Sequence, residues 1–359
     1  MTQTSLESRL SFHHDAFVFD GHNDMLLRHL AGEDVTSTRE YGHLDLPRMR
    51  EGGLDGGIFA VWIDPGHPDP EPHTLEGLAK SREFLNKTPG FRLVLEAEDL
   101  DAARLDGDVA VVLGVEGGYA IDRELDTVNR LYDEGMRCLT LTWMVPTAWA
   151  DAAGPSGAEE IHGGLTDFGR RVVDRLQTLG CVIDLSHSSD SVACQVLEQV
   201  DVPVTASHSG CRSVASHPRN LPDDLLEALA AGGGVMGINL FSAYLDEAYA
   251  EAHAALELRV TRDERDSFRH MAQLCSQHLA PVPLSRFSDH VEHAVRVAGP
   301  EHVGLGSDFD GAPALPREIR DARDLPLITA ALADRGFDAA GLTSFLGANF
   351  QRLLGTVLT

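Results

Sequence analysis

Five short apolar runs in this chain each end in a histidine or a carboxylate, and this pattern constrains the fold more than any other feature. The residues at or just after the ends of these runs are His22 with Asp24, Glu116, His187, His208 and Asp308. A single buried strand that ends in a polar residue is common. Five in succession indicate that residues far apart in the sequence converge on one site.

Apolar runs rich in Val, Ile and Leu are typical of parallel strands buried on both faces. Eight such strands are expected at 17–22, 57–63, 109–115, 137–143, 181–186, 202–207, 234–240 and 303–307. Helical patterns lie between them at 74–86, 122–134, 166–179, 190–199, 222–231 and 287–298. This alternation predicts an α/β fold, a TIM-like (β/α)8 barrel with its site at the C-terminal ends of the strands. The alternative is a doubly wound open sheet, which uses only the strand ends near its switch point.

The length and composition suit one large domain. The chain has 359 residues, of which 43% are hydrophobic, enough to bury a large core. We expect a single domain over residues 1–359, because no linker divides the chain. The stretch 242–286 is too long for a simple loop, and we expect it to be an inserted, helical segment over the barrel mouth.

The charge excludes some partners. A net charge of −27 argues against nucleic acid, whose phosphates would be repelled. The chain has two lysines, Lys80 and Lys87, a bias that either a GC-rich genome or a high-salt cytoplasm explains. No window approaches the roughly 20 apolar residues of a membrane span. The N-terminus lacks a signal-peptide pattern, and the five scattered cysteines suit reduced thiols, so a cytoplasmic location is expected.

Three histidines and three carboxylates are enough to hold two divalent cations. His22 and Asp24 lie on the same side of an extended strand end, because side chains alternate with a period of two. His187 and His208 end successive strands, and neutral imidazole is a common metal ligand. Each histidine alone is equally compatible with a core or capping role. Glu116, followed by two glycines, suits a bridge between two cations, with helix capping as the alternative.

Asp308 is the expected proton-handling group, because it directly follows its apolar run, whereas Asp310 fits a turn. Two-metal sites hold a water that is nucleophilic at neutral pH, and a carboxylate can take its proton. Nitrogen and oxygen ligands without a thiolate favour two Zn²⁺ per chain, with Mn²⁺ or Fe²⁺ as alternatives. The chemistry implied is metal-assisted hydrolysis of an amide or ester.

Several motifs together resemble the renal, or membrane, dipeptidase family, within the amidohydrolase-like metal-dependent hydrolases. They run in order from about residue 16 to residue 354. The matching stretches are Asp20-Gly21-His22-Asn23-Asp24, Gly114-Val115-Glu116-Gly117-Gly118, Leu139-Thr140-Leu141-Thr142, Gly164-Leu165-Thr166-Asp167-Phe168-Gly169, Ile183-Asp184-Leu185-Ser186-His187, Ser207-His208-Ser209, Arg219-Asn220-Leu221-Pro222-Asp223, Gly306-Ser307-Asp308-Phe309-Asp310-Gly311 and Gly347-Ala348-Asn349-Phe350.

The resemblance implies a role for each site residue. One zinc would be held by His22 and Asp24, the other by His187 and His208. Glu116 would bridge the two ions, and Asp308 would contact the hydroxide between them and shuttle its proton. Arg219 would bind the C-terminal carboxylate of a dipeptide, a task that suits a guanidinium, and Arg212 in the same loop is its nearest competitor.

One position departs from the family pattern. Where well-known members carry a histidine that contacts the scissile carbonyl, this chain has Trp143. An indole N–H donates one hydrogen bond but carries no positive charge. The expected function is hydrolysis of small dipeptides, including those with a D-residue at the C-terminal position. Trp143 leaves two alternatives open: an amidohydrolase acting on a non-peptide amide or lactone, and a metal-binding homologue with little peptidase activity. No membrane partner is expected, and a homodimer is one possible assembly.

Overall fold

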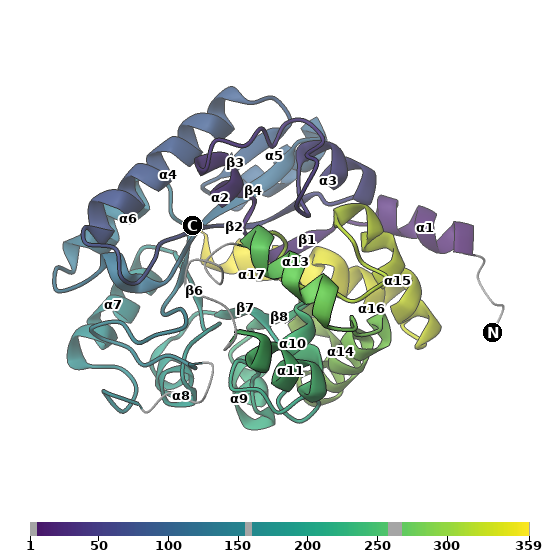
Figure 1. Ribbon diagram of the computed structural model, residues 1–359. Coiled ribbons are helices and arrows are strands. Elements are labelled where there is room, and N and C mark those ends of the chain that lie inside the picture. The colour runs from purple at the N-terminus through teal and green to yellow at the C-terminus, as the bar shows by residue number, and fades with distance from the viewer. Residues whose placement is uncertain (1–5, 155–159, 258–267, 359) are drawn as a thin grey trace.

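The computed structural model describes residues 6–154, 160–257 and 268–358, and its centre is a ring of parallel strands surrounded by helices (Figure 1). The ring consists of β1 (Phe19–Asn23), β2 (Gly56–Trp62), β4 (Val109–Glu116), β5 (Cys138–Thr140), β6 (Val182–Asp184), β7 (Thr205–Ser209), β8 (Val235–Asn239) and β9 (Val303–Gly306). Hydrogen bonds join them in the order β2-β1-β9-β8-β7-β6-β5-β4, and β4 pairs with β2 to close the ring. The predicted (β/α)8 barrel is confirmed, and the open sheet is excluded.

A further strand, β3 (Phe91–Val94), was not predicted from the sequence. It pairs with residues 109–112 of β4, while β5 pairs with residues 114–116 of the same strand. Since β2 occupies the other edge of β4, β3 and β5 share one edge in succession. The sequence Phe-Arg-Leu-Val is short and interrupted by a charge, so it lacks the continuous apolar run by which the barrel strands were recognised.

The helices follow the strands around the barrel. They are α1 (Leu6–Asp15), α2 (Met25–Leu30), α3 (Leu46–Gly52), α4 (Pro70–Lys87), α5 (Glu98–Asp106), α6 (Asp126–Asp133), α7 (Asp167–Thr178), α8 (Asp190–Gln199), α9 (Asp223–Ala231), α14 (Leu284–Ala298), α15 (Leu325–Asp334), α16 (Ala339–Thr343) and α17 (Asn349–Val357). All six predicted helices are present, with ends shifted by at most four residues. Thr166 is the N-cap of α7, as predicted: its hydroxyl accepts a hydrogen bond from the Gly169 N–H.

Side-chain alternation along β4 aims Glu116 into the barrel. Ala110 and Val112 belong to a buried cluster that joins residues of β1, β2, β5, β6 and β8, strands that meet inside the ring, with residues of β3, α5 and α17. Val111 and Val115 belong to the other cluster, which includes residues of most of the surrounding helices, among them α4, α6 and α7. Because alternate residues share a face, Glu116 lies on the same side as Ala110 and Val112, at the C-terminal end of the barrel interior.

The stretch 242–286 contains α10 (Ser242–Leu245), α11 (Glu247–Glu257) and α13 (Phe268–His278), and its residues 258–267 lie outside the described residues. The first residue of α13, Phe268, packs against His43, with ring centroids 5.6 Å apart. The His43 ring in turn lies 5.6 Å from that of Phe309, next to Asp308. The start of α13 therefore lies near the C-terminal end of β9.

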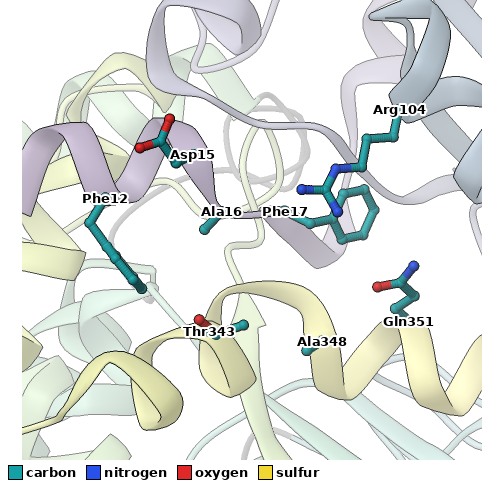
Figure 2. Close-up of a pocket in the computed structure, with 8 residues that line it drawn as sticks. All are labelled: Phe12, Asp15, Ala16, Phe17, Arg104, Thr343, Ala348 and Gln351. Carbon is teal, nitrogen blue, oxygen red and sulfur yellow. The ribbon is translucent and has the colours of Figure 1, made fainter.

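A hollow of about 220 Å³, shown in Figure 2, lies at the end of the barrel where the strands begin. Its lining includes Phe17, which precedes β1, Arg104 of α5, and Gln351 of α17. The guanidinium of Arg104 is 6.0 Å from the centre of the Phe17 ring. Since Phe17 lies before the first strand, this hollow belongs to the N-terminal face, whereas sites in such barrels lie at the C-terminal face.

The barrel interior is so closely packed that a single added methyl group tests the fold. A Cβ at Gly237 in β8 would lie 2.0 Å from the carbonyl oxygen of Ser207. We predict that Gly237→Ala lowers the free energy of unfolding by about 1–3 kcal/mol or more. Gly355→Ala in α17 is the control, because no atom lies within 4 Å of its Cβ position, and it should be neutral or stabilising. Denaturation midpoints followed by circular dichroism measure both, and equal midpoints for Gly237→Ala and the unmodified protein would contradict the packing.

Candidate metal centre

The structure brings all six predicted ligand and shuttle residues together at the C-terminal ends of the strands. They lie at or just after the ends of β1 (His22, Asp24), β4 (Glu116), β6 (His187), β7 (His208) and β9 (Asp308). In the described residues, two sets of three ligand atoms each lie within 4.8 Å of one another: Glu116, His187 and His208, and His22, Asp24 and Asp308. A third set combines His22 and His208 with Asp184.

The two oxygens of Glu116 face different imidazoles. Its Oε1 lies 3.0 Å from Nε2 of His187 and 3.5 Å from Nε2 of His208. Its Oε2 lies 3.8 Å from Nε2 of His22, and the same nitrogen is 3.8 Å from Oδ2 of Asp24. The carboxylate therefore lies between two groups of ligands, which is the arrangement that a bridge between two ions requires.

Two of the site residues adopt a backbone conformation that L-residues rarely take. His187 and Asp308 have φ angles of 68° and 57°. Such conformations cost on the order of 1 kcal/mol each and persist where surrounding contacts enforce them. The His187 carbonyl accepts from the Thr142 hydroxyl and from the Ala153 N–H, at 2.9 and 2.7 Å. The Asp308 N–H donates to the His22 carbonyl at 3.0 Å.

A hydrogen-bond chain fixes the His208 ring. The Ser207 hydroxyl donates to Oδ2 of Asp184 at 2.6 Å, so it is left to accept from Nδ1 of His208 at 2.8 Å. Nε2 of His208 then carries the lone pair that a metal ligand needs. Asp184 itself is not a suitable ligand, because its two oxygens already accept from four donors: the N–H groups of Ser186 and Ser207 and the hydroxyls of Thr140 and Ser207.

The same arrangement recurs beside Asp308. The buried Asp20 of β1 accepts from both the N–H and the hydroxyl of Ser307, each at 2.6 Å. Ser307 immediately precedes Asp308, as Ser207 precedes His208. In both cases an aspartate of a neighbouring strand holds the serine before a site residue, and we call these pairs the Asp–Ser clasps. Sequence reasoning gave no role to Asp20 or Asp184, although both lie in motifs at strand ends.

Asn239 is a further residue that sequence reasoning missed. Its Nδ2 donates to Oδ2 of Asp308 at 3.0 Å, and its Oδ1 accepts from the Phe241 N–H at 2.6 Å. The signal was present, since Asn239 ends the apolar run of β8. Asp310 points elsewhere: it forms a buried ion pair with Arg39 at 2.7 Å, in keeping with the choice of Asp308 over Asp310.

Burial and the surrounding charges shift the pKa values of the site strongly. Burial raises the pKa of Glu116 to about 8, and loss of solvation raises that of the half-buried Asp308 to about 7. Burial lowers the pKa of His187 and of His208 well below the ordinary value, which keeps both imidazoles neutral. Burial also opposes charge on His22, but the carboxylates of Glu116 and Asp24 outweigh it and raise its pKa to about 10.

These residues fit divalent cations. Nε2 of His22 and Oδ1 of Asp24 are buried and have no hydrogen-bond partner among the described residues. Enclosed carboxylates need positive charge nearby. A proton on His22 and a cation beside it meet the same need, and metal binding releases such a proton. The nitrogen and oxygen donor set is one that zinc accepts.

Arg219 is buried beside the metal-ligand cluster. Its side chain is 2% exposed, its Nη2 donates to the His208 carbonyl at 3.1 Å, and its guanidinium lies 5.2 Å from the centre of the Tyr244 ring. Among the described residues Arg219 forms no ion pair, and its Nε has no acceptor. Arg212, the competing arginine, is instead bound to both oxygens of Asp190, at 2.5 and 2.8 Å.

Trp143 lies against the ligand cluster on another side. Its ring centroid is 6.2 Å from that of His187 and 5.0 Å from that of Trp62, which ends β2. The backbone N–H of Trp143 donates to the hydroxyl of Tyr119 at 3.1 Å. Position 143 therefore borders the site, as the resemblance implies, with an indole in place of an imidazole.

A closed parallel barrel with a cluster of histidines and carboxylates at its mouth is the arrangement expected of a metal-dependent enzyme of the TIM-barrel type. The family model described as membrane dipeptidase, peptidase family M19, matches residues 7–359, and the chain belongs to this family. Members of the family are metal-dependent hydrolases. None of the helices in the described residues is long and apolar enough to cross a membrane.

Relatives and solved structures agree with the family assignment. Dipeptidase 3 of Mus musculus is 30% identical over 98% of this chain, and the chain spans 66% of that protein's length. A metallopeptidase of Rhodobacter sphaeroides, solved with a phosphinate mimic of the dipeptide L-Ala-D-Ala, is 28% identical, with a TM-score of 0.80 over 95% of this chain and 99% of that one. A metallopeptidase of family M19 named dipeptidase AC is 29% identical, with a TM-score of 0.80 over 96% and 99%.

The Asp–Ser clasp at His208 gives a prediction for metal binding. Ser207→Ala removes the acceptor of Nδ1 and should weaken zinc binding about 10- to 100-fold. Ser209→Ala, two residues along the same strand, is the matched control, because the Ser209 hydroxyl has no hydrogen-bond partner among the described residues. Calorimetric zinc titration of the metal-free variants measures the difference. Equal affinities for the two variants would show that the clasp does not orient the ligand.

Proposed function

We propose that this chain is a zinc-dependent dipeptidase that cleaves small dipeptides with a free C-terminal carboxylate. The observation that carries the proposal is the division of the Glu116 oxygens between two ligand groups, Oε1 toward His187 and His208 and Oε2 toward His22. His22 and Asp24 would hold one zinc ion, His187 and His208 the other, and Glu116 both. Bound there, the two ions would supply a Lewis acid and lower the pKa of water toward neutrality.

The residues around the metal ligands have separate tasks. Arg219 binds the substrate carboxylate, which supplies the negative partner that its buried guanidinium lacks among the described residues. Asp308 accepts the proton of the attacking water and passes it to the leaving amine. Asn239 holds Oδ2 of Asp308, while Oδ1 accepts no hydrogen bond from the described residues and is available for the proton.

The substrate class, location and assembly complete the proposal. The Rhodobacter sphaeroides relative was solved with a mimic of a dipeptide that ends in a D-residue, which supports testing such substrates here.

Four of the five cysteines are buried, and all five are free thiols, which supports a reducing, cytoplasmic location. Cell fractionation tests the location. The homodimer remains a prediction, and light scattering tests it.

The shuttle role of Asp308 gives the first functional prediction. Asp308→Asn keeps the shape of the side chain but removes its basicity, so kcat should fall about 10²- to 10⁴-fold. Metal analysis of the same variant should still find about two zinc ions per chain, as in the unmodified protein. If the Asp308→Asn variant retains full turnover, Asp308 is not the proton shuttle. If the unmodified protein contains no zinc and added zinc does not raise its stability, the proposed metal centre is wrong.

The carboxylate-binding role of Arg219 gives the second. Arg219→Met keeps much of the side-chain volume and removes the charge, so KM for dipeptides should rise roughly 10- to 100-fold. Arg212→Met is the matched control from the same loop, because its charge pairs with Asp190 away from the ligand cluster. Steady-state kinetics on Ala-Ala and Ala-D-Ala separate the two. An unchanged KM for Arg219→Met would favour the alternative suggested by Trp143, hydrolysis of a non-peptide amide or lactone.

A further inference from the structure

Two tryptophans form an aromatic wall beside the metal-ligand cluster. Trp62 ends β2 and is level with Glu116, its partner in the β2–β4 register. Trp143 follows β5, and the two rings meet edge-on, with centroids 5.0 Å apart and planes at 65°. The Trp143 ring also lies 6.2 Å from that of His187. We call Trp62 and Trp143 the tryptophan wall.

The backbone at Trp143 is fixed by Tyr119. The backbone N–H of Trp143 donates to the Tyr119 hydroxyl at 3.1 Å, and that hydroxyl donates to the Val145 carbonyl at 2.5 Å. Both tryptophans are half-buried, so each keeps part of its surface available. A partly exposed aromatic surface offers a large contact area at little cost in conformational entropy, because an indole side chain has only two torsions.

The wall lies across the ligand cluster from Arg219. Trp62 is the last residue of β2 and Trp143 lies just beyond β5, and these two strands flank β4 in the ring. Arg219 and Tyr244 follow β7 and β8 on the other side. The metal ligands lie between these two sides. A dipeptide whose carboxylate meets Arg219 and whose peptide carbonyl reaches the ligands therefore extends its N-terminal residue toward the wall.

We propose that Trp62 and Trp143 contact the side chain of the substrate's N-terminal residue, and that the chain prefers dipeptides with a large apolar or aromatic residue there. This inference rests on the proposed dipeptidase function. At position 143, a tryptophan that offers apolar contact area then replaces a histidine that can carry charge. This departure from the family pattern would determine which N-terminal residue the enzyme prefers. The indole rings bring no charge, and a wall of this kind favours burial of carbon over binding of a polar side chain.

The experiment compares zinc-loaded enzyme on Gly-Ala, Leu-Ala, Phe-Ala and Lys-Ala. The unmodified protein should show kcat/KM at least about 10-fold higher for Leu-Ala or Phe-Ala than for Gly-Ala. Trp62→Ala should reduce that ratio roughly 5- to 10-fold, because half of the wall is removed. Trp62→Phe should restore most of the ratio, since the ring remains and the Trp62 indole N–H has no hydrogen-bond partner among the described residues.

Three results would overturn the inference. The first is a Trp62→Ala variant with normal zinc content and an unchanged ratio. The second is loss of the ratio to the same extent in Trp62→Phe, which would assign it to the indole N–H. The third is a preference for Lys-Ala, which would make the wall a cation site.

Failure of the dipeptidase proposal is distinguishable from failure of the wall. If the zinc-loaded protein cleaves none of the four dipeptides, the proposed function is wrong, and binding then tests the wall. Calorimetry with phosphinate mimics of Leu-Ala and Gly-Ala should give dissociation constants that differ about 10-fold in the unmodified protein and converge in Trp62→Ala. Equal constants in the unmodified protein would exclude the wall as a side-chain contact.

Discussion

The enclosure of three carboxylates in one small volume is the constraint on which the rest of the site depends. Asp24 and Glu116 are buried and Asp308 is half-buried, and their mutual repulsion and loss of hydration must be offset by positive charge. The structure offers Arg219 and a His22 whose pKa is raised to about 10. Divalent cations meet the same need more fully, and the neutral imidazoles of His187 and His208 are ready to bind them. The same buried negative charge that destabilises the folded protein without a cation therefore favours the binding of metal ions.

Hydrogen bonds within the barrel stabilise site residues that have unfavourable backbone conformations. His187 and Asp308 adopt left-handed backbone conformations. The segment that follows β5 donates two hydrogen bonds to the His187 carbonyl, and the Asp308 N–H donates to the carbonyl of His22 in β1. The two Asp–Ser clasps act on the residues just before His208 and Asp308, so the side chains that bind metal and move protons project from anchored backbone. Such support from outside the ligand set orients the ligands and tunes their basicity.

The sequence predicted the barrel and the cluster because both follow from local pattern. Continuous apolar runs mark buried parallel strands, and in a closed barrel their C-terminal ends must meet, so His22, Glu116, His187, His208 and Asp308 were found together. Their roles remain predictions. Strand β3 was not predicted, because its four residues include an arginine and do not form a continuous apolar run. The roles of Asp20 and Asp184 were not predicted for a different reason. Each role depends on a hydrogen-bond partner on another strand, and Ser307, the partner of Asp20, is 287 positions away in the sequence. Trp62 likewise gains significance only once Trp143 lies beside it.

We propose that Glu116 lies between two metal ions, each with its own pair of ligands. A crystal structure of the zinc-loaded protein, with anomalous scattering recorded at the zinc edge, tests this directly. Two peaks are expected about 3.5–4 Å apart, as in other two-metal sites. One should lie beside His22 and Asp24, the other beside His187 and His208, and both should contact the Glu116 carboxylate. A single peak, or peaks away from these side chains, would contradict a bridging role for Glu116.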